Sequence, residues 1–261
     1  MAMKDLLIRY RRNFRKLRAI LHYFLFRHRK TVARLSSYGI TGVRAYRVKQ
    51  WVRHIDKNVI RYYYDAKFNG VRCFVKISSD STAQNELFVN KYATERGIGF
   101  IPKLLMSSEI SEGGTFMAVM EFVQGMRKFE LPNDMPAFIK LCEEFENIHR
   151  ILLEACIIHS DISKSNLMLD ENGHIILIDF GIGKAPGSEV FEIDYQLHGG
   201  TYYADSGNTR TYDDAYSFLR MLDDSGITDI YKQLNCYTRL LDLVGTHSYS
   251  ISAPVRGANS R

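Results

Sequence analysis

The chain has 261 residues, of which 46% are hydrophobic and 25% charged, a composition typical of folded globular proteins rather than of disordered segments. Its four cysteines form no C-x-x-C pair, which argues against a zinc ribbon or a disulfide framework and favours a reduced, cytoplasmic protein. No apolar run approaches the roughly 20 residues that span a bilayer.

The first 34 residues differ from the rest in charge. They carry eleven Lys and Arg against one acid, Asp5, so their net charge is +10 while the remainder of the chain is at −4. Apolar and aromatic residues recur there at three- and four-residue steps, which predicts a basic amphipathic helix; they are Tyr10, Phe14, Leu17, Leu21, Phe24 and His28.

Two interpretations of this helix stay open. It can lie on an anionic membrane surface, at the inner face of a membrane, where each cation contributes about 1 kcal/mol. Alternatively, it packs onto its own domain through the aromatic stripe and leaves its basic face in solvent. Nothing downstream has the pattern of an RNA or DNA module, so we expect no nucleic acid partner.

A β-rich region follows the predicted helix. Strands are predicted at 46–53, 59–64 and 71–77, with Asn69-Gly70 as a tight hairpin turn between the last two. A helix over 81–96, strands at 100–105 and 115–123, and a long helix over 133–155 come next.

The stretch HSDISKSNLMLDENGHIILIDFG, residues 159–181, carries the chemistry. Two short apolar runs, 167–169 and 175–178, flank the turn Glu171-Asn-Gly173 and predict a β-hairpin. This hairpin brings Asn166 beside Asp179, with Asp161 in the preceding loop. An amide and a carboxylate oxygen suit Mg²⁺, and a second carboxylate can accept a proton from an attacking hydroxyl. These are the requirements of phosphoryl transfer.

The same residues resemble the catalytic loop and metal-binding motif of the protein kinase-like superfamily. The pattern H-x-D-x-x-x-x-N matches His159, Asp161 and Asn166, and D-F-G matches Asp179-Phe180-Gly181. The resemblance implies an α+β, bilobal fold with an antiparallel-sheet N-lobe and a mainly helical C-lobe. We expect an N-terminal extension over 1–45, an ATP-binding lobe over 46–124 and a catalytic lobe over 125–261.

The resemblance also implies roles for single residues, with ATP and Mg²⁺ as cofactors. Lys76 looks like the lysine that pairs with the α- and β-phosphates, and Glu86 like its acidic partner. Glu121 and Val123 belong to a segment similar to the one that binds adenine. For the chemistry, the resemblance implies Asp161 as catalytic carboxylate, Asn166 and Asp179 as metal and nucleotide ligands, and Lys164 near the γ-phosphate. It implies structural roles for two further residues: His159 packs near Phe180, and Asp214 braces the catalytic loop.

Three departures from the pattern bear on the substrate. No G-x-G-x-x-G joins the first two predicted strands, whose turn we place at 54–58. Ser163 stands where serine/threonine protein kinases usually carry a lysine, and no A-P-E follows Gly200-Thr-Tyr-Tyr. Fewer than fifty residues follow Asp214, a length similar to that of the lipopolysaccharide and sugar kinases of bacterial envelopes.

We therefore expect a kinase that phosphorylates a hydroxyl acceptor, with an envelope saccharide or lipid-linked saccharide as the favoured substrate. The alternatives are a serine/threonine protein kinase and a pseudokinase scaffold, for which the missing glycine loop is the main support.

Overall fold

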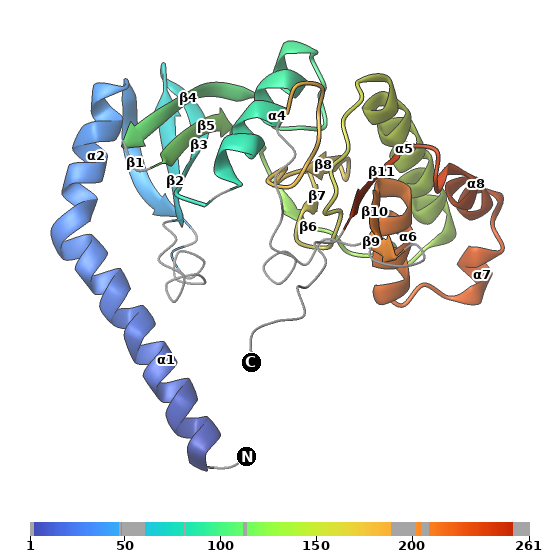
Figure 1. Cartoon of the computed structure of the whole chain (residues 1–261), viewed down its shortest axis with the longest axis horizontal. Coiled ribbons are helices and arrows are strands. Elements are labelled where there is room, and N and C mark those ends of the chain that lie inside the picture. The colour runs from blue at the N-terminus through green and yellow to red at the C-terminus, as the bar shows by residue number, and fades with distance from the viewer. Residues whose placement is uncertain are drawn as a thin grey trace. The chain divides into compact units, whose positions relative to one another are not determined.

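The computed structural model describes residues 3–46, 48, 61–80, 82–111, 114–188, 202–204 and 209–252. Contacts divide the chain into two compact units (Figure 1), Met1–Ala83 with Leu104–Phe122 and Gln84–Lys103 with Val123–Arg261. Each unit has its own cluster of buried apolar side chains. The domain bounds expected from the sequence stay a prediction.

The first unit contains a five-stranded antiparallel sheet in the order β1-β2-β3-β5-β4. Its strands are β1 Ile40–Tyr46, β2 Arg61–Phe68, β3 Val71–Ser78, β4 Leu104–Ser111 and β5 Thr115–Glu121. The predicted turn between β2 and β3 is confirmed: Asn69 and Gly70 have φ of 50° and 80°, the left-handed backbone that a two-residue hairpin requires.

Side chains that belong to the core of the first unit alternate along β3 with side chains that do not, which distinguishes the two faces of the sheet. Val75 and Ile77 are buried in the core of the first unit and pair in register with Val119 and Met117. Because successive side chains of a strand point to opposite faces, Lys76 lies on the other face.

The basic N-terminal segment is helical, as the sequence predicts. It consists of α1 Met3–His22, a π-helical turn η1 Tyr23–Arg27 and α2 His28–Ser37. Tyr23 is buried and its hydroxyl bonds that of Tyr64 on β2, while Leu35 of α2 packs into the same core. These contacts attach the helical segment to the Val75 face of the sheet.

The face of the helix that packs is not the predicted stripe. Ile20 and Tyr23 contact the core, whereas Phe14, Leu17 and Leu21 are largely exposed. The alternative in which the stripe packs onto its own domain therefore does not hold for these three residues. The physical reason is the helix direction: α1 extends beyond the sheet (Figure 1), so only its last turns have sheet beneath them.

One strand was not predicted and another begins later than predicted. The strand β1, Ile40–Tyr46, was not predicted, and most of the strand predicted at 46–53 and the turn predicted at 54–58 lie outside the described residues. Gly39 and Gly42 have φ values of 78° and 61°; Gly39 lies just before β1, and Gly42 lies at an irregularity within it. The strand predicted at 100–105 begins only at Leu104 and runs to Ser111; residues 101–103 before it are irregular.

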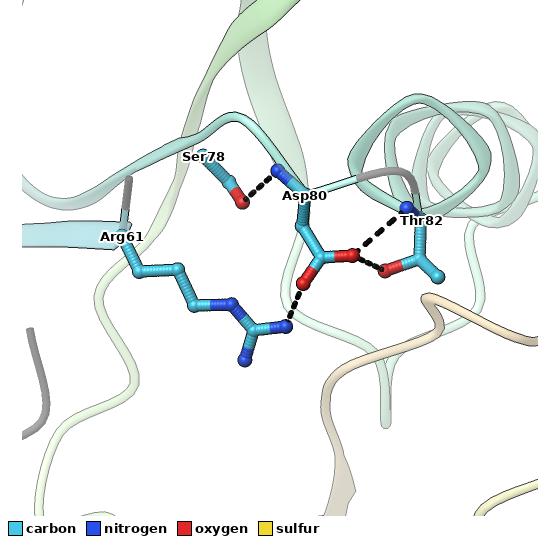
Figure 2. Close-up of polar contacts among 4 residues, drawn as sticks. All are labelled: Arg61, Ser78, Asp80 and Thr82. Carbon is cyan, nitrogen blue, oxygen red and sulfur yellow. Dashed lines mark hydrogen bonds and ion pairs between the residues drawn. The ribbon is translucent and has the colours of Figure 1, made fainter. Parts of the chain in front are cut away.

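A polar cluster closes the end of β3 (Figure 2). Asp80 accepts hydrogen bonds at 3.0 Å and 2.9 Å from the amide and hydroxyl of Thr82, and it forms an ion pair with Arg61, the first residue of β2. Burial alone would raise the pKa of Asp80, but the Thr82 hydrogen bonds and the Arg61 charge hold that pKa well below its usual range. The cluster lies just before α4.

The second unit is mainly helical, with two small sheets. Its elements are α4 Ala83–Glu95, β6 Arg127–Lys128, α5 Met135–Glu154, β7 Leu167–Leu169, β8 Ile175–Leu177, β9 Tyr202–Ala204, β10 Thr209–Asp213, α6 Asp214–Asp224, α7 Asp229–Lys232, α8 Asn235–Leu243 and β11 Ser248–Ser252. The predicted helix over 133–155 is confirmed. Asp134 caps it by accepting from the Ala137 amide at 2.8 Å, and its Phe145 stacks on Phe218 of α6 with ring centroids 3.7 Å apart.

Candidate active site

The hairpin β7–β8 forms as predicted and positions two of the candidate ligands. Leu167 pairs with Leu177, and the Ile178 amide donates to the Asn166 carbonyl at 3.0 Å. Asn166 and Asp179 therefore lie at neighbouring ends of the two strands. Asp179 has a φ of 68°, a strained conformation for a residue with a side chain, and such residues cluster at functional sites.

Asn166 also holds Asp161. Its side-chain nitrogen Nδ2 donates to the Asp161 carbonyl at 3.0 Å and to the Asp161 carboxylate oxygen Oδ2 at 2.8 Å. With Nδ2 committed to these acceptors, the amide oxygen Oδ1 is the atom of Asn166 suited to a metal. The structure thus brings Asp161, Asn166 and Asp179 together, as the sequence predicts.

The electrostatics of this cluster set Asp161 apart from an ordinary aspartate. Burial raises the pKa of Asp161 to about 7, and the nearby Asp179 carboxylate adds to the increase, while the Asn166 hydrogen bond opposes it. A carboxylate with a pKa near neutrality is suited to accept a proton from a hydroxyl.

His159 is structural, as expected. Its ring lies 4.3 Å from the Phe180 ring, centroid to centroid, and burial lowers the pKa of the imidazole. Nδ1 accepts from the Asp161 amide at 3.2 Å, so Nε2 carries the proton and donates to the Ile178 carbonyl at 3.0 Å. The neutral ring therefore joins the loop of Asp161 to the strand that leads to Asp179.

Asp214 braces the same loop from the start of α6. Its carboxylate oxygens accept from the amides of His159 at 2.7 Å and Ser160 at 2.9 Å. The side chain is fully buried, and burial raises its pKa while the two amides oppose this. Ser160 has a φ of 68°, so the brace holds a strained turn in place.

Sequence reasoning missed two residues that support the site. Asn85, in the first turn of α4, donates through Nδ2 to the carbonyls of Gly181 at 3.1 Å and Gly183 at 2.7 Å. Tyr249 on β11 accepts from the Ser160 hydroxyl at 3.2 Å. The only available signal for Asn85 was its position next to Glu86, and no local pattern marks Tyr249.

The other predicted site residues are divided between the two units. Lys76 lies on β3 and Glu121 ends β5 in the first unit, whereas Glu86 is buried on α4 and Val123 follows β5 in the second. Lys164 is exposed, and its ammonium donates to the Asp224 carbonyl at 2.9 Å, at the end of α6. The predicted phosphate role of Lys164 would require that bond to break.

A divalent cation fits the oxygen set at Asn166 and Asp179. Among the residues that the structure describes, no group of three or more His, Cys, Asp or Glu side chains is arranged to hold a metal. A site of one carboxylate and one amide oxygen suits Mg²⁺, which usually takes only one or two carboxylates and completes its coordination with waters and phosphate oxygens.

Comparison with known proteins gives a result that agrees with this geometry. Residues 115–182, which include Asp161, Asn166 and Asp179, match the model of the RIO domain. Together with the sheet and helices described above, the match shows that the chain is similar to proteins of the protein kinase-like superfamily.

Individual relatives are distant. The chain is 29% identical over 141 residues to a protein of Dictyostelium discoideum named as a probable serine/threonine-protein kinase, an alignment that covers 47% of this chain and 29% of that protein. Among solved structures, the PK-1 kinase of the Cydia pomonella granulovirus aligns over 48% of this chain and 51% of its own, with 21% identity and a TM-score of 0.39. The chain thus spans about a third of the curated relative and about half of the viral kinase.

Proposed function

We propose that the protein transfers the γ-phosphate of ATP to a serine or threonine hydroxyl of a protein. The observation that carries this proposal is the Asp161 carboxylate, held by Asn166 and beside Asp179 within the segment that matches the RIO domain. The similarity to a protein named as a serine/threonine kinase favours a protein acceptor over the saccharide acceptor expected from the sequence.

Each residue of the cluster has a distinct part in the proposed reaction. Asp161 orients the acceptor hydroxyl and takes its proton. Asp179 and the Asn166 amide oxygen hold Mg²⁺, which neutralises charge on the transferred phosphate when bound. His159 and Asp214 are positioning residues, since their hydrogen bonds go to the backbone of the Asp161 loop and of the strand that leads to Asp179.

The nucleotide is proposed to lie on the Lys76 face of the sheet, with Lys76 at the α- and β-phosphates and Glu86 as its acidic partner. Phe74 is on the same face as Lys76, two positions earlier on β3, and stacks on Tyr63 with centroids 5.8 Å apart. Glu121, the last residue of β5, and Val123, two positions later, are proposed to bind the adenine through their backbone groups.

The test is phosphate transfer from labelled ATP with Mg²⁺, to a generic serine/threonine peptide in one arm and to an envelope saccharide extract in the other. Asp161→Asn should lower turnover by about a thousandfold or more while ATP binding persists, and Asp179→Ala should lower it similarly. Glu171→Gln, an exposed acid in the hairpin turn, is the matched control and should keep wild-type activity.

Each outcome has a clear meaning. Labelled peptide with wild-type protein and not with Asp161→Asn supports the proposal. Label in the saccharide arm alone would mean that the acceptor is a saccharide and not a protein. Nucleotide binding without transfer in either arm makes the chain a pseudokinase scaffold.

A further inference from the structure

Apolar side chains are exposed along one face of α1 and η1. Phe14, Leu17 and Leu21 are 59%, 55% and 51% exposed, and Phe24 and Leu25 continue the stripe at 36% and 71%. These residues are spaced by three, four, three and one, so they form one continuous stripe along the helix. The opposite side, through Ile20 and Tyr23, is the part that contacts the sheet.

Cations border this stripe. Arg11, Arg15 and Arg18 are exposed on α1, next to Phe14 and Leu17 along the helix. One acid, Asp5, occurs in the first 34 residues, which carry a net charge of +10 against −4 for the rest of the chain. An apolar stripe beside a band of arginines is the pattern of a helix that lies in the plane of an anionic lipid surface.

A cavity between α2 and the sheet of the first unit is lined by further cations of the same helical segment. It has a volume of about 480 Å³ beside α2, and its lining includes Arg27, Lys30 and Arg34 together with the exposed Phe26. Three cations around a cavity with an apolar wall suit the phosphate of a lipid headgroup. The charge therefore continues from α1 into α2 on one unbroken helical segment.

We infer that α1 and η1 dock the protein onto an anionic phospholipid bilayer, with the Phe14 to Leu25 stripe in the interface and the arginines at the headgroups. The helix lies on the bilayer and does not cross it, since no helix of the described residues is long and apolar enough to span a membrane. Charge complementarity selects the bilayer over a second copy of the chain, because two such segments would bring their positive charges together.

The test is sedimentation of the full chain with vesicles, in the absence of ATP. Vesicles of phosphatidylcholine with phosphatidylglycerol are compared with vesicles of phosphatidylcholine alone. Wild type should bind the anionic vesicles at least about tenfold more tightly, and binding should weaken as salt rises. Because no nucleotide is present, the result does not depend on whether the protein is a kinase.

Two variants separate the apolar and the charged contributions. Leu17→Glu/Leu21→Glu and Arg11→Glu/Arg15→Glu/Arg18→Glu should each lower binding about tenfold or more. Ile230→Glu, at a residue 64% exposed on α7, is the matched control and should bind as wild type. Far-ultraviolet circular dichroism checks that the helices persist in every variant.

Three results would overturn the inference. They are no sedimentation with anionic vesicles, equal sedimentation with both vesicle types, and unchanged binding in Leu17→Glu/Leu21→Glu. A concentration-dependent dimer that the same double variant abolishes would assign the stripe to a second copy of the chain instead.

Discussion

The Asp214 carboxylate accepts a hydrogen bond of 2.7 Å from the backbone amide of His159, which lies 55 positions earlier in the chain. Its other oxygen accepts from Ser160. In Asp214→Asn one of these amides would face an NH₂ group, which cannot accept. We expect a loss of about 1 to 3 kcal/mol in unfolding free energy by urea denaturation, and a fall in phosphate transfer of about tenfold or more.

Asp242→Asn is the control for this variant, because Asp242 is exposed on α8. It should change neither quantity. If Asp214→Asn retained both wild-type stability and wild-type turnover, the brace would have no function in positioning Asp161.

The Asp80 cluster predicts a pH-dependent contribution to stability. The folded-state pKa of Asp80 lies below its unfolded value, so the contribution is complete above the unfolded pKa of about 3.9 and is lost as pH falls through the folded value. Asp80→Asn should therefore cost about 2 kcal/mol near neutral pH, and the difference from wild type should shrink in acid below about pH 4.

Denaturant unfolding at several pH values measures this difference. Asp65→Asn is the control, because Asp65 pairs with Arg72, whose side chain is 49% exposed, against 19% for Arg61. An ion pair at that exposure should contribute less than about 1 kcal/mol. If the difference in unfolding free energy between Asp80→Asn and wild type stayed constant down to acid pH, the lowered pKa of Asp80 would be contradicted.

Gly125 is predicted to tolerate no side chain. Its φ is 65°, and a Cβ atom there would lie 2.6 Å from Cβ and 3.1 Å from Cα of Glu171. Gly97 has nearly the same φ, 67°, but open space around it. Gly97→Ala should cost about 1 kcal/mol for the backbone conformation alone, and Gly125→Ala at least about 1 kcal/mol more for the overlap.

Thermal unfolding of the two variants isolates the steric contribution, because the backbone cost is common to both. Equal losses would mean that the hairpin turn containing Glu171 moves aside freely.

Local patterns predicted the centre of the site well. The hairpin of β7 and β8, the helix α5 and the adjacency of Asn166 and Asp179 all follow from short-range periodicity and turn residues. The strand β1 was not predicted, because Gly42 interrupts its short pattern, and the strand accommodates Gly42 at an irregularity between Thr41 and Arg44.

Long-range contacts were beyond local reasoning. Asn85 reaches Gly181 over 96 positions and Tyr249 reaches Ser160 over 89, and neither residue type at its place signals such a partner. The exposure of Leu17 and Leu21 was equally hidden, since periodicity finds an apolar stripe but not what covers it.

The loop of Asp161 is held by partners outside itself, and this governs how it opens. The amides of His159 and Ser160 bond the Asp214 side chain, the Asp161 amide bonds the His159 ring, and that ring bonds the Ile178 carbonyl. None of these hydrogens can reach solvent by fraying of the loop alone. They should exchange with deuterium together, at the rate at which the start of α6 separates from the hairpin.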